Sequence, residues 1–264
     1  MTRRAAWPLM MAGQGEPLML VHGWGMSQGV WAPLLPHLAK EFECWAVDLP
    51  GHGALADEAR LGGLEELTER LLSFLPPQPT HLLLWSMGAL PGLELARRHP
   101  ERIASLTLVA ATPRFTRGDQ WPHAMDAEVL SEFAENLQQD YRATLARFLA
   151  LQSQGMGGSA PLLRQLRATL AASPPAPQAL REGLQLLRQC DLRQSFAELS
   201  CPCAVLLGEY DRLVPGAVAA SLKALRADLD VHIFPGLGHA PFLSQPQAFA
   251  AQYEAIWRSW RDAI

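Results

Sequence analysis

Ser86 directly follows an apolar run of three leucines and a tryptophan in the stretch HLLLWSMGAL (81–90). A strand this apolar is expected to be buried, so a hydroxyl at its end raises the question of catalysis. A tight strand-to-helix turn lifts a serine Oγ above the carboxyl edge of a sheet, where the next helix offers N–H groups to a developing oxyanion. On this stretch alone, a nucleophile and an ordinary buried serine are equally good interpretations of Ser86.

The residues around Ser86 only partly follow the G-x-S-x-G pattern of such a turn. Gly88 supplies the second glycine, but Leu84 stands where the first belongs. Small residues flank the turn because strand and helix approach closely there. Pro91 and Gly92 also weaken the helix that should follow. We expect the turn to form nonetheless, with the strand or the helix displaced by Leu84.

A serine is a poor nucleophile unless a base, oriented by an acid, takes its proton. In doubly wound sheets with this turn, the chain order is serine, acid, histidine. GEYDRLVP places Asp211 at the exit of a late strand, and FPGLGHAPF places His239 in a glycine-rich loop after the last one. Separately, Asp211 could cap a helix and His239 could be a surface histidine. Their order after Ser86 favours a catalytic triad.

An oxyanion site requires two N–H donors. Met87, directly after the serine, is one candidate, and Trp24 in LVHGWGMS is the other, its side chain also walling the pocket. His22 is a rival base, but a histidine at a His-Gly strand exit more often braces the loop through hydrogen bonds. Asp48 and His52 in DLPGHG have the pattern of turn formers.

Short apolar strands alternate with amphipathic helices, which predicts a doubly wound α/β fold with a mostly parallel sheet. We expect strands at 17–23, 42–50, 80–86, 104–112, 203–211 and 229–236, and helices at 63–75 and 246–260. The alternation stops between 113 and 199, where helical patterns occupy 126–152, 159–172 and 177–190. We interpret 113–199 as a helical lid inserted into a core formed by 1–112 and 200–264.

The bulk composition excludes several classes of protein. The 264 residues are 49% hydrophobic and 18% charged, which is typical of a globular chain, and a net charge of −4 gives no reason to expect nucleic acid binding. No apolar run is long enough to span a membrane. MTRRAAWPLMMAGQGEP imitates a signal peptide, but a first strand and hairpin fit it better. Four cysteines without metal-ligand spacing favour a cytoplasmic protein with reduced thiols and no metal.

HGWG, DLPGHG, WSMG, GEYD and GHAPF, in this order over 17–260, together resemble the α/β-hydrolase superfamily. Finer features resemble one member family, the pimeloyl-acyl carrier protein methyl ester carboxylesterases of biotin synthesis. These features are HGWGMSQGVW, HPERI, RFLALQ (147–152), CDLRQ (190–194) and HAPFLSQP. RFLALQ and CDLRQ are the more specific ones because lids diverge most.

The resemblance implies a function and a set of roles. Ser86 attacks the methyl ester, His239 transfers the proton to methanol, Asp211 holds the imidazole, and Trp24 and Met87 bind the oxyanion. The lid residues of the acyl channel would be Phe148, Leu149, Ala150, Leu151 and Gln152. The implied partner is an acyl carrier protein bearing a methyl-esterified pimeloyl chain. No cofactor is implied, and we expect a monomer.

The lid carries an excess of positive charge that fits an acidic carrier protein. Between 141 and 193, seven arginines face two acids, a balance of +5. Arg147 and Arg164 match basic lid positions of the family by spacing, although such arginines can also be ordinary solvated surface. A general short-chain carboxylesterase or acyl thioesterase would use the same triad, and an inactive hydrolase-like binding module is a further alternative. A haloalkane dehalogenase would need a carboxylate at position 86.

Overall fold

The computed structural model describes residues 10–152 and 160–262. A seven-stranded sheet has the order β1-β3-β2-β4-β5-β6-β7, and β1 alone among these strands pairs in the antiparallel sense. This confirms the predicted doubly wound α/β class. The strands are β1 (Met10–Ala12), β2 (Glu16–Val21), β3 (Phe42–Val47), β4 (Thr80–Trp85), β5 (Ile103–Val109), β6 (Cys203–Gly208) and β7 (Asp230–Phe234).

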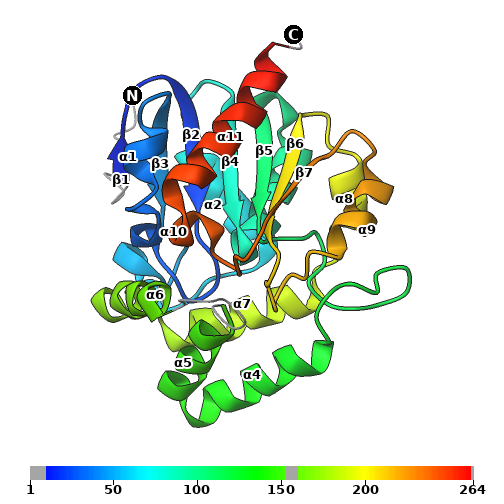
Figure 1. Cartoon of the computed structure of the whole chain (residues 1–264). Helices are drawn as coiled ribbons and strands as arrows, with labels where there is room; N and C mark the ends of the chain where they lie inside the picture. The colour runs from blue at the N-terminus through cyan, green and yellow to red at the C-terminus, as the bar shows by residue number, and fades with distance from the viewer. Residues whose placement is uncertain (1–9, 153–159, 263–264) are drawn as a thin grey trace.

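Helices cover both faces of the sheet (Figure 1). One face is covered by α1 (Leu35–Leu38), α10 (Pro241–Ser244) and α11 (Pro246–Arg261). The other is covered by α2 (Leu64–Phe74), α3 (Ala89–Arg98), α8 (Arg193–Ala197) and α9 (Val218–Leu225). Within the described residues, no helix combines the length and the apolarity needed to cross a membrane.

The apolar strands feed two cores because alternate side chains point to opposite faces of the sheet. Leu82 and Leu84 of β4 join the core beneath α2 and α3, whereas Leu83 and Trp85 join the core beneath α11. All four are fully or almost fully buried. A strand buried on both faces therefore explains the unbroken apolar run that precedes Ser86.

The predicted N-terminal hairpin is wrong. β1 pairs with β3, not with β2, so the connection passes beneath the start of β3. Gly13 and Gly15 have positive φ values and lie directly against the backbone of residues 39–42: a Cβ on Gly13 would sit 2.3 Å from the Phe42 oxygen. The two glycines allow a crossing that a side chain would block.

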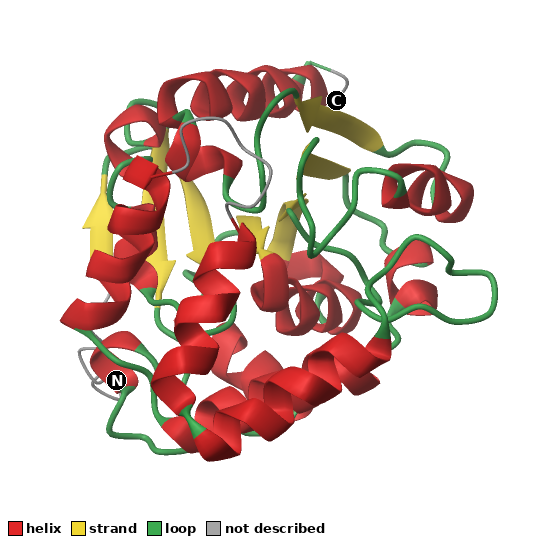
Figure 2. Ribbon diagram, turned by 60° about the horizontal axis from the view of Figure 1, so that its bottom comes forward, coloured by secondary structure: helices red, strands yellow, loops and turns green. Residues whose placement is uncertain are grey.

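Residues 113–199, between β5 and β6, contain helices and two isolated bridges in their described part. Helices α4 to α7 gather at one end of the sheet (Figures 1 and 2). The helical pattern at 126–152 is two helices, because Asp140 ends the first and its carboxylate accepts the Ala143 N–H of the second at 2.9 Å. The four lid helices are α4 (Ala127–Gln139), α5 (Tyr141–Gln152), α6 (Ala160–Ala172) and α7 (Pro177–Gln189).

Candidate active site

Ser86 occupies a strained turn between β4 and α3. Its φ of +52° lies in the left-handed region, which non-glycine residues seldom adopt, and a single 3-10 turn (Ser86–Gly88) leads directly into α3. Gly88 is essential to this packing, since a Cβ there would lie 2.6 Å from the His22 carbonyl oxygen. Gly23 lies in the loop after β2, and a Cβ there would lie 2.9 Å from the Ser86 Cβ. Both glycines let neighbouring backbone close around the serine.

Leu84 is accommodated by a glycine eight residues downstream. A Cβ on Gly92 of α3 would lie 2.3 Å from Leu84 Cδ1 and 2.7 Å from Cδ2, so the leucine occupies the space of the missing side chain. We expected Leu84 to displace the strand or the helix. Instead, the absence of a side chain at Gly92 of α3 gives Leu84 the space that it needs. Pro91 is the third residue of α3 and so lies in the first turn of that helix, where a proline is tolerated better than in a helix interior.

The structure brings Ser86, His239 and Asp211 into one hydrogen-bonded chain. Ser86 Oγ lies 2.9 Å from His239 Nε2, and His239 Nδ1 lies 2.8 Å from Asp211 Oδ2. The other Asp211 oxygen accepts the backbone N–H groups of Leu213 and Val214 at 2.8 and 3.0 Å. With that carboxylate fixed at both oxygens, the imidazole is oriented toward the serine. We call Ser86, His239 and Asp211 the carboxyl-edge trio.

The backbone of His239 is held from two sides. Its carbonyl oxygen accepts the indole N–H of Trp85 at 2.8 Å, and its N–H donates to the Gln152 carbonyl at 3.2 Å. The first bond ties the histidine loop to the residue before Ser86. The second ties it to the end of lid helix α5, so the lid contributes to the position of the imidazole.

Trp24 and Met87, the two predicted oxyanion donors, lie together beneath the lid. Neither backbone N–H donates to another described residue. The Trp24 indole donates to the Leu180 carbonyl of α7 at 2.8 Å. Gly183 of the same helix packs on both residues, and a Cβ there would lie 2.7 Å from Trp24 Cδ1 and 2.8 Å from Met87 Sδ. Sequence reasoning missed Gly183, although a glycine inside an amphipathic helix often marks a close approach.

The predicted channel stretch is helical, so its five residues cannot share one direction. Phe148, Leu149 and Gln152 are buried, Leu151 is half-buried, and Ala150 is exposed. The assignment of all five residues to an acyl channel stays a prediction, in which Ala150 would lie on the exposed side of the helix. Phe148 stands edge-on to the Trp24 ring at 4.6 Å between centroids. Neither amide atom of Gln152 has a hydrogen-bond partner in the described structure.

His22, Asp48 and His52 have structural roles, as predicted. His22 Nδ1 lies 2.8 Å from the Gly23 carbonyl and Nε2 accepts the Leu49 N–H at 3.0 Å, so both ring nitrogens are occupied and neither is available as a base. Burial lowers the pKa of His22 to about 4, which keeps it neutral. Asp48 accepts the Ala54 N–H and shapes the turn. His52 Nδ1 lies 3.0 Å from the Pro50 carbonyl.

A second serine, histidine and carboxylate chain was missed by sequence reasoning. Ser105 Oγ lies 2.8 Å from His81 Nδ1, and His81 Nε2 lies 2.7 Å from Glu16 Oε2. Glu16 also accepts the indole N–H of Trp257 at 3.1 Å. These residues lie within the first three residues of β5, β4 and β2, and we call Ser105, His81 and Glu16 the amino-edge trio. The signal was a histidine inside an apolar strand, but its partners depend on strand order and register.

The two predicted docking arginines are exposed on neighbouring lid helices. Arg147 of α5 lies 3.6 Å from Glu132 and over the Phe133 ring, and Arg164 lies on α6. A cavity of about 430 Å³ opens between these helices, with Arg142 and Arg167 at its wall. The remaining lining residues are mostly apolar: Tyr141, Leu145, Ala146, Leu149, Leu170, Ala171 and Pro174.

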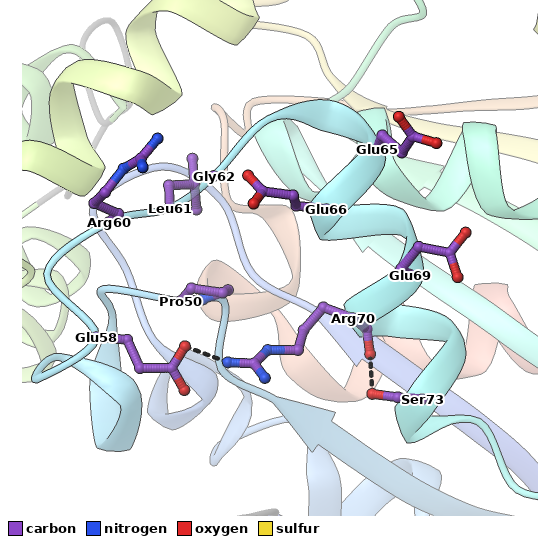
Figure 3. A pocket seen from close by; sticks show the side chains of 10 residues that line it. All are labelled: Pro50, Glu58, Arg60, Leu61, Gly62, Glu65, Glu66, Glu69, Arg70 and Ser73. Atoms are coloured by element: carbon purple, nitrogen blue, oxygen red, sulfur yellow. Dashed lines mark hydrogen bonds and ion pairs between the residues drawn. The ribbon is translucent and has the colours of Figure 1, made fainter.

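A different hollow, of about 790 Å³, lies along α2 and the loop before it (Figure 3). Its wall is strongly charged, with Glu58 paired to Arg70 and three further glutamates on α2. It contains no residue of the carboxyl-edge trio and no nucleophile oriented by a base. We therefore place no chemistry there.

Comparisons with known proteins identify the family of the chain. A model of the Alpha/beta hydrolase family matches residues 18–252. The chain belongs to the alpha/beta hydrolase family. Pimeloyl-[acyl-carrier protein] methyl ester esterases are among the similar curated proteins. The one from Xanthomonas oryzae is 41% identical over 88% of this chain and 90% of its own length. The one from Nitrosomonas europaea is 39% identical over 92% and 96%.

Solved structures of other proteins share the fold of this hydrolase. An esterase from Exiguobacterium antarcticum matches with a TM-score of 0.83 at 20% identity, over 94% of this chain and 93% of that one. A bromoperoxidase from Bacillus anthracis matches with a TM-score of 0.82 at 18% identity, over 95% and 94%. At such identities the likeness concerns the fold alone, and the chemistry must be argued from the site.

Proposed function

We propose that this carboxylic ester hydrolase cleaves the methyl ester of pimeloyl-acyl carrier protein, with Ser86, His239 and Asp211 as its catalytic triad. The main support for this proposal is the hydrogen-bonded chain from Ser86, in its left-handed turn, to His239 at 2.9 Å and on to Asp211 at 2.8 Å. The substrate is proposed from relatives about 40% identical over most of the chain, whose names specify this ester.

In the proposed reaction, Ser86 Oγ attacks the ester carbonyl while His239 Nε2 takes the hydroxyl proton. The carbonyl oxygen becomes an oxyanion between the N–H groups of Trp24 and Met87. His239 then protonates the leaving oxygen, and methanol departs from the acyl-enzyme. Water, deprotonated by the same imidazole, releases the free pimeloyl carboxylate and restores Ser86. Asp211 stabilises the imidazolium throughout and keeps Nε2 directed at the serine.

The charge distribution of the lid supports an acidic protein as the carrier of the acyl chain. Helices α5 and α6 contain four arginines and no acid. Helix α4 contains Glu128, Glu132 and Glu135 and no base. The positive charge is thus concentrated on α5 and α6, on either side of the apolar cavity, where an acyl arm and its acidic carrier would arrive together.

The remaining parts of this proposal concern the setting. The described cysteines are free thiols, three of them buried. This is consistent with a reducing compartment, and we place the enzyme in the cytoplasm. We propose that it acts as a monomer and requires no cofactor, since every step above uses side chains and backbone groups of the chain.

The decisive experiment incubates the enzyme with pimeloyl-acyl carrier protein methyl ester and follows loss of the methyl group by mass spectrometry. We expect conversion to the free acid with the thioester intact, and none with Ser86→Ala. Cleavage of the thioester would instead identify an acyl thioesterase. Activity on p-nitrophenyl butyrate without activity on the carrier substrate would identify a general short-chain esterase, and activity on neither a binding module.

A further inference from the structure

We propose that Leu84 and Gly92 form a matched pair that sets the separation of β4 and α3, and that Gly92 is thereby a positioning residue for Ser86. The two residues lie on either side of the nucleophile turn, one two residues before Ser86 and the other six after it. The inference rests on the proposed role of Ser86 and adds a determinant that the elbow pattern alone would not reveal.

The contact between the pair leaves no free space. A Cβ on Gly92 would meet Leu84 at three atoms, Cδ1 at 2.3 Å, Cδ2 at 2.7 Å and Cγ at 3.0 Å. Leu84 is fully buried and belongs to the core beneath α2 and α3, so its side chain cannot swing into solvent. Protein cores are packed as densely as organic crystals and contain few voids that could accept a displaced isobutyl group. A methyl group at position 92 must therefore push β4 and α3 apart or force Leu84 into a strained rotamer.

Such a displacement acts on the reacting atoms because the turn between β4 and α3 is short. Only Trp85 and the single 3-10 turn Ser86–Gly88 separate the strand position of Leu84 from the helix. Ser86 depends on this turn for its left-handed φ, and Met87 for the direction of its N–H. Misplacement by about 1 Å can cost a reaction on the order of 100-fold in rate. The separation of the two elements thus controls nucleophile and oxyanion donor together.

The pair also accounts for two departures that are unfavourable when taken singly. A leucine at position 84 removes the small residue that an elbow normally needs, and a glycine at position 92 weakens a helix by about 1 kcal/mol relative to alanine. Each is compensated by the other. The small residue is still present at the strand–helix contact, but it has moved from the strand to the helix.

The test is a double-mutant cycle with p-nitrophenyl butyrate, which needs no carrier protein. Gly92→Ala should lower kcat by about tenfold or more while KM changes by less than about threefold, because the damage is to alignment and not to substrate binding. Gly92→Ala combined with Leu84→Val should recover kcat to within about threefold of the parent enzyme. The combined change conserves the number of carbon atoms at the contact and removes the two colliding Cδ atoms. Leu84→Val alone should stay within about threefold.

Two controls separate positioning from general destabilisation. Leu93→Ala truncates a fully buried neighbour in the same helix without adding an atom near Leu84, and it should lower the unfolding temperature while leaving kcat within about threefold in the folded range. Gly63→Ala adds a methyl where a Cβ would meet nothing within 4 Å and should leave kcat unchanged. If Gly92→Ala does not fold, recovery of a folded, active protein by the added Leu84→Val is the readout.

Several outcomes would contradict the proposal that Leu84 and Gly92 form a matched pair. A kcat equal to that of the parent enzyme in Gly92→Ala would show that the contact tolerates an added methyl group. Loss of kcat in Gly92→Ala that Leu84→Val fails to restore would show that position 92 acts through some other contact. A loss matched by Leu93→Ala at equal unfolding temperature would reduce Gly92 to a stability residue. Full activity in Ser86→Ala would instead refute the proposed nucleophile, which is a different result from any of these.

Discussion

At the carboxyl edge of the sheet, Ser86 Oγ lies 2.9 Å from the His239 ring, which lies 2.8 Å from the Asp211 carboxylate. At the amino edge, Ser105 Oγ lies 2.8 Å from the His81 ring, which lies 2.7 Å from the Glu16 carboxylate. The side-chain types and distances are nearly the same. The rings are used in opposite senses: His239 offers Nε2 to its serine, whereas His81 offers Nδ1. Distances and side-chain types therefore do not distinguish the catalytic carboxyl-edge trio from the structural amino-edge trio.

The backbone separates them. Ser86 has a φ of +52° and is followed by a helix, with Met87 and Trp24 N–H groups at hand. Ser105 is the third residue of β5, in the interior of a strand, and its hydroxyl is fully buried. A strand residue commits its neighbouring N–H groups to the sheet, so no pair of donors can gather around an oxyanion there.

The carboxylates are also held differently. Asp211 is buried and has one oxygen fixed by two backbone N–H groups, which leaves the other for the imidazole. The Glu16 side chain is about half exposed and shares one oxygen between His81 and the Trp257 indole. The amino-edge trio joins β2, β4, β5 and the last helix, which is a role in cohesion. Catalysis requires a strained turn and free donors around the trio as well as the trio itself.

The strongest test of the difference between the two trios is to replace each serine by alanine in turn. Ser86→Ala should lower kcat by at least ~10³-fold, in line with the loss of a triad member, because no other hydroxyl among the described residues is hydrogen-bonded to His239 Nε2. Ser105→Ala should leave kcat within about twofold. Hydrolysis of p-nitrophenyl butyrate measures both.

Labelling gives an independent view of the same contrast. A serine-directed phosphonate should modify Ser86 and leave Ser105 and Ser27 untouched, as peptide mapping by mass spectrometry would show. Substantial hydrolysis by Ser86→Ala, or phosphonate on Ser105, would mean that the amino-edge trio is a second catalyst and would remove the distinction drawn from the backbone.

The contrast also shows what a sequence can and cannot give. Ser86, Asp211 and His239 could be found because each follows the end of a strand at the same edge, and chain order alone brings such residues together. Ser105, His81 and Glu16 lie near the amino-terminal ends of their strands, and their contact depends on the order β2-β4-β5 and on the pairing of His81 with Ser105. Nothing local encodes that register. The strands themselves were predictable from apolar runs, but the crossing of β1 under β3 was not.

Glycines mark a similar boundary of prediction. Gly88 fits a turn pattern, so its role could be anticipated from neighbouring residues. Gly92 and Gly183 lie inside helices, where the sequence shows only a weak helix former. Their meaning lies in what faces them, Leu84 in one case and Trp24 with Met87 in the other. Such contacts between elements are fixed by tertiary packing and are visible only in three dimensions.

The amino edge should matter for stability where the carboxyl edge matters for rate. His81→Leu leaves the buried Ser105 hydroxyl without its partner, and an unpaired buried hydroxyl costs about 1–3 kcal/mol. We expect urea denaturation to show a loss of that order in the free energy of unfolding, with kcat nearly unchanged at temperatures where the variant is folded. His123→Leu, at an exposed position, is the matched control and should be neutral. Unaltered stability in His81→Leu would remove the structural role of the trio.

Acid should weaken the amino-edge trio in a defined direction. Burial lowers the pKa of His81, and the bond to Glu16 opposes this only in part, so the folded protein binds this proton less readily than the unfolded chain. The stability that neutral His81 contributes is therefore present above about pH 6.5 and is lost as the pH falls below it, by at most ~1.4 kcal/mol per pH unit.

The measurement compares parent and His81→Leu by urea denaturation at about pH 7.5 and about pH 5.5, a window chosen around the ordinary histidine value. The stability gap between the two proteins should shrink at the lower pH. In the parent protein Glu16 stays ionised across this window, because His81 and Trp257 hold its pKa below the ordinary value of 4.5 against the effect of burial. A gap that widens on acidification would mean that His81 is charged in the folded state and forms an ion pair with Glu16.

The smallest expected effects concern the surface that leads to the carboxyl edge. Arg147→Glu with Arg164→Glu reverses charge on the basic lid helices, and exposed pairs contribute only about 0–1 kcal/mol each, so two changes are needed. They should lower kcat/KM for a carrier-bound ester at low salt by slowing encounter, and leave p-nitrophenyl butyrate nearly unaffected because steering precedes bond making. The defect should shrink as salt shortens the screening length toward ~8 Å.

Arg258→Glu with Arg261→Glu makes the same change in charge on α11, at the other end of the molecule, and should be close to neutral for both substrates. Equal losses in the two double variants would show that overall charge, and not the lid, governs encounter, whereas loss on both substrates in the lid variant would show a damaged lid fold.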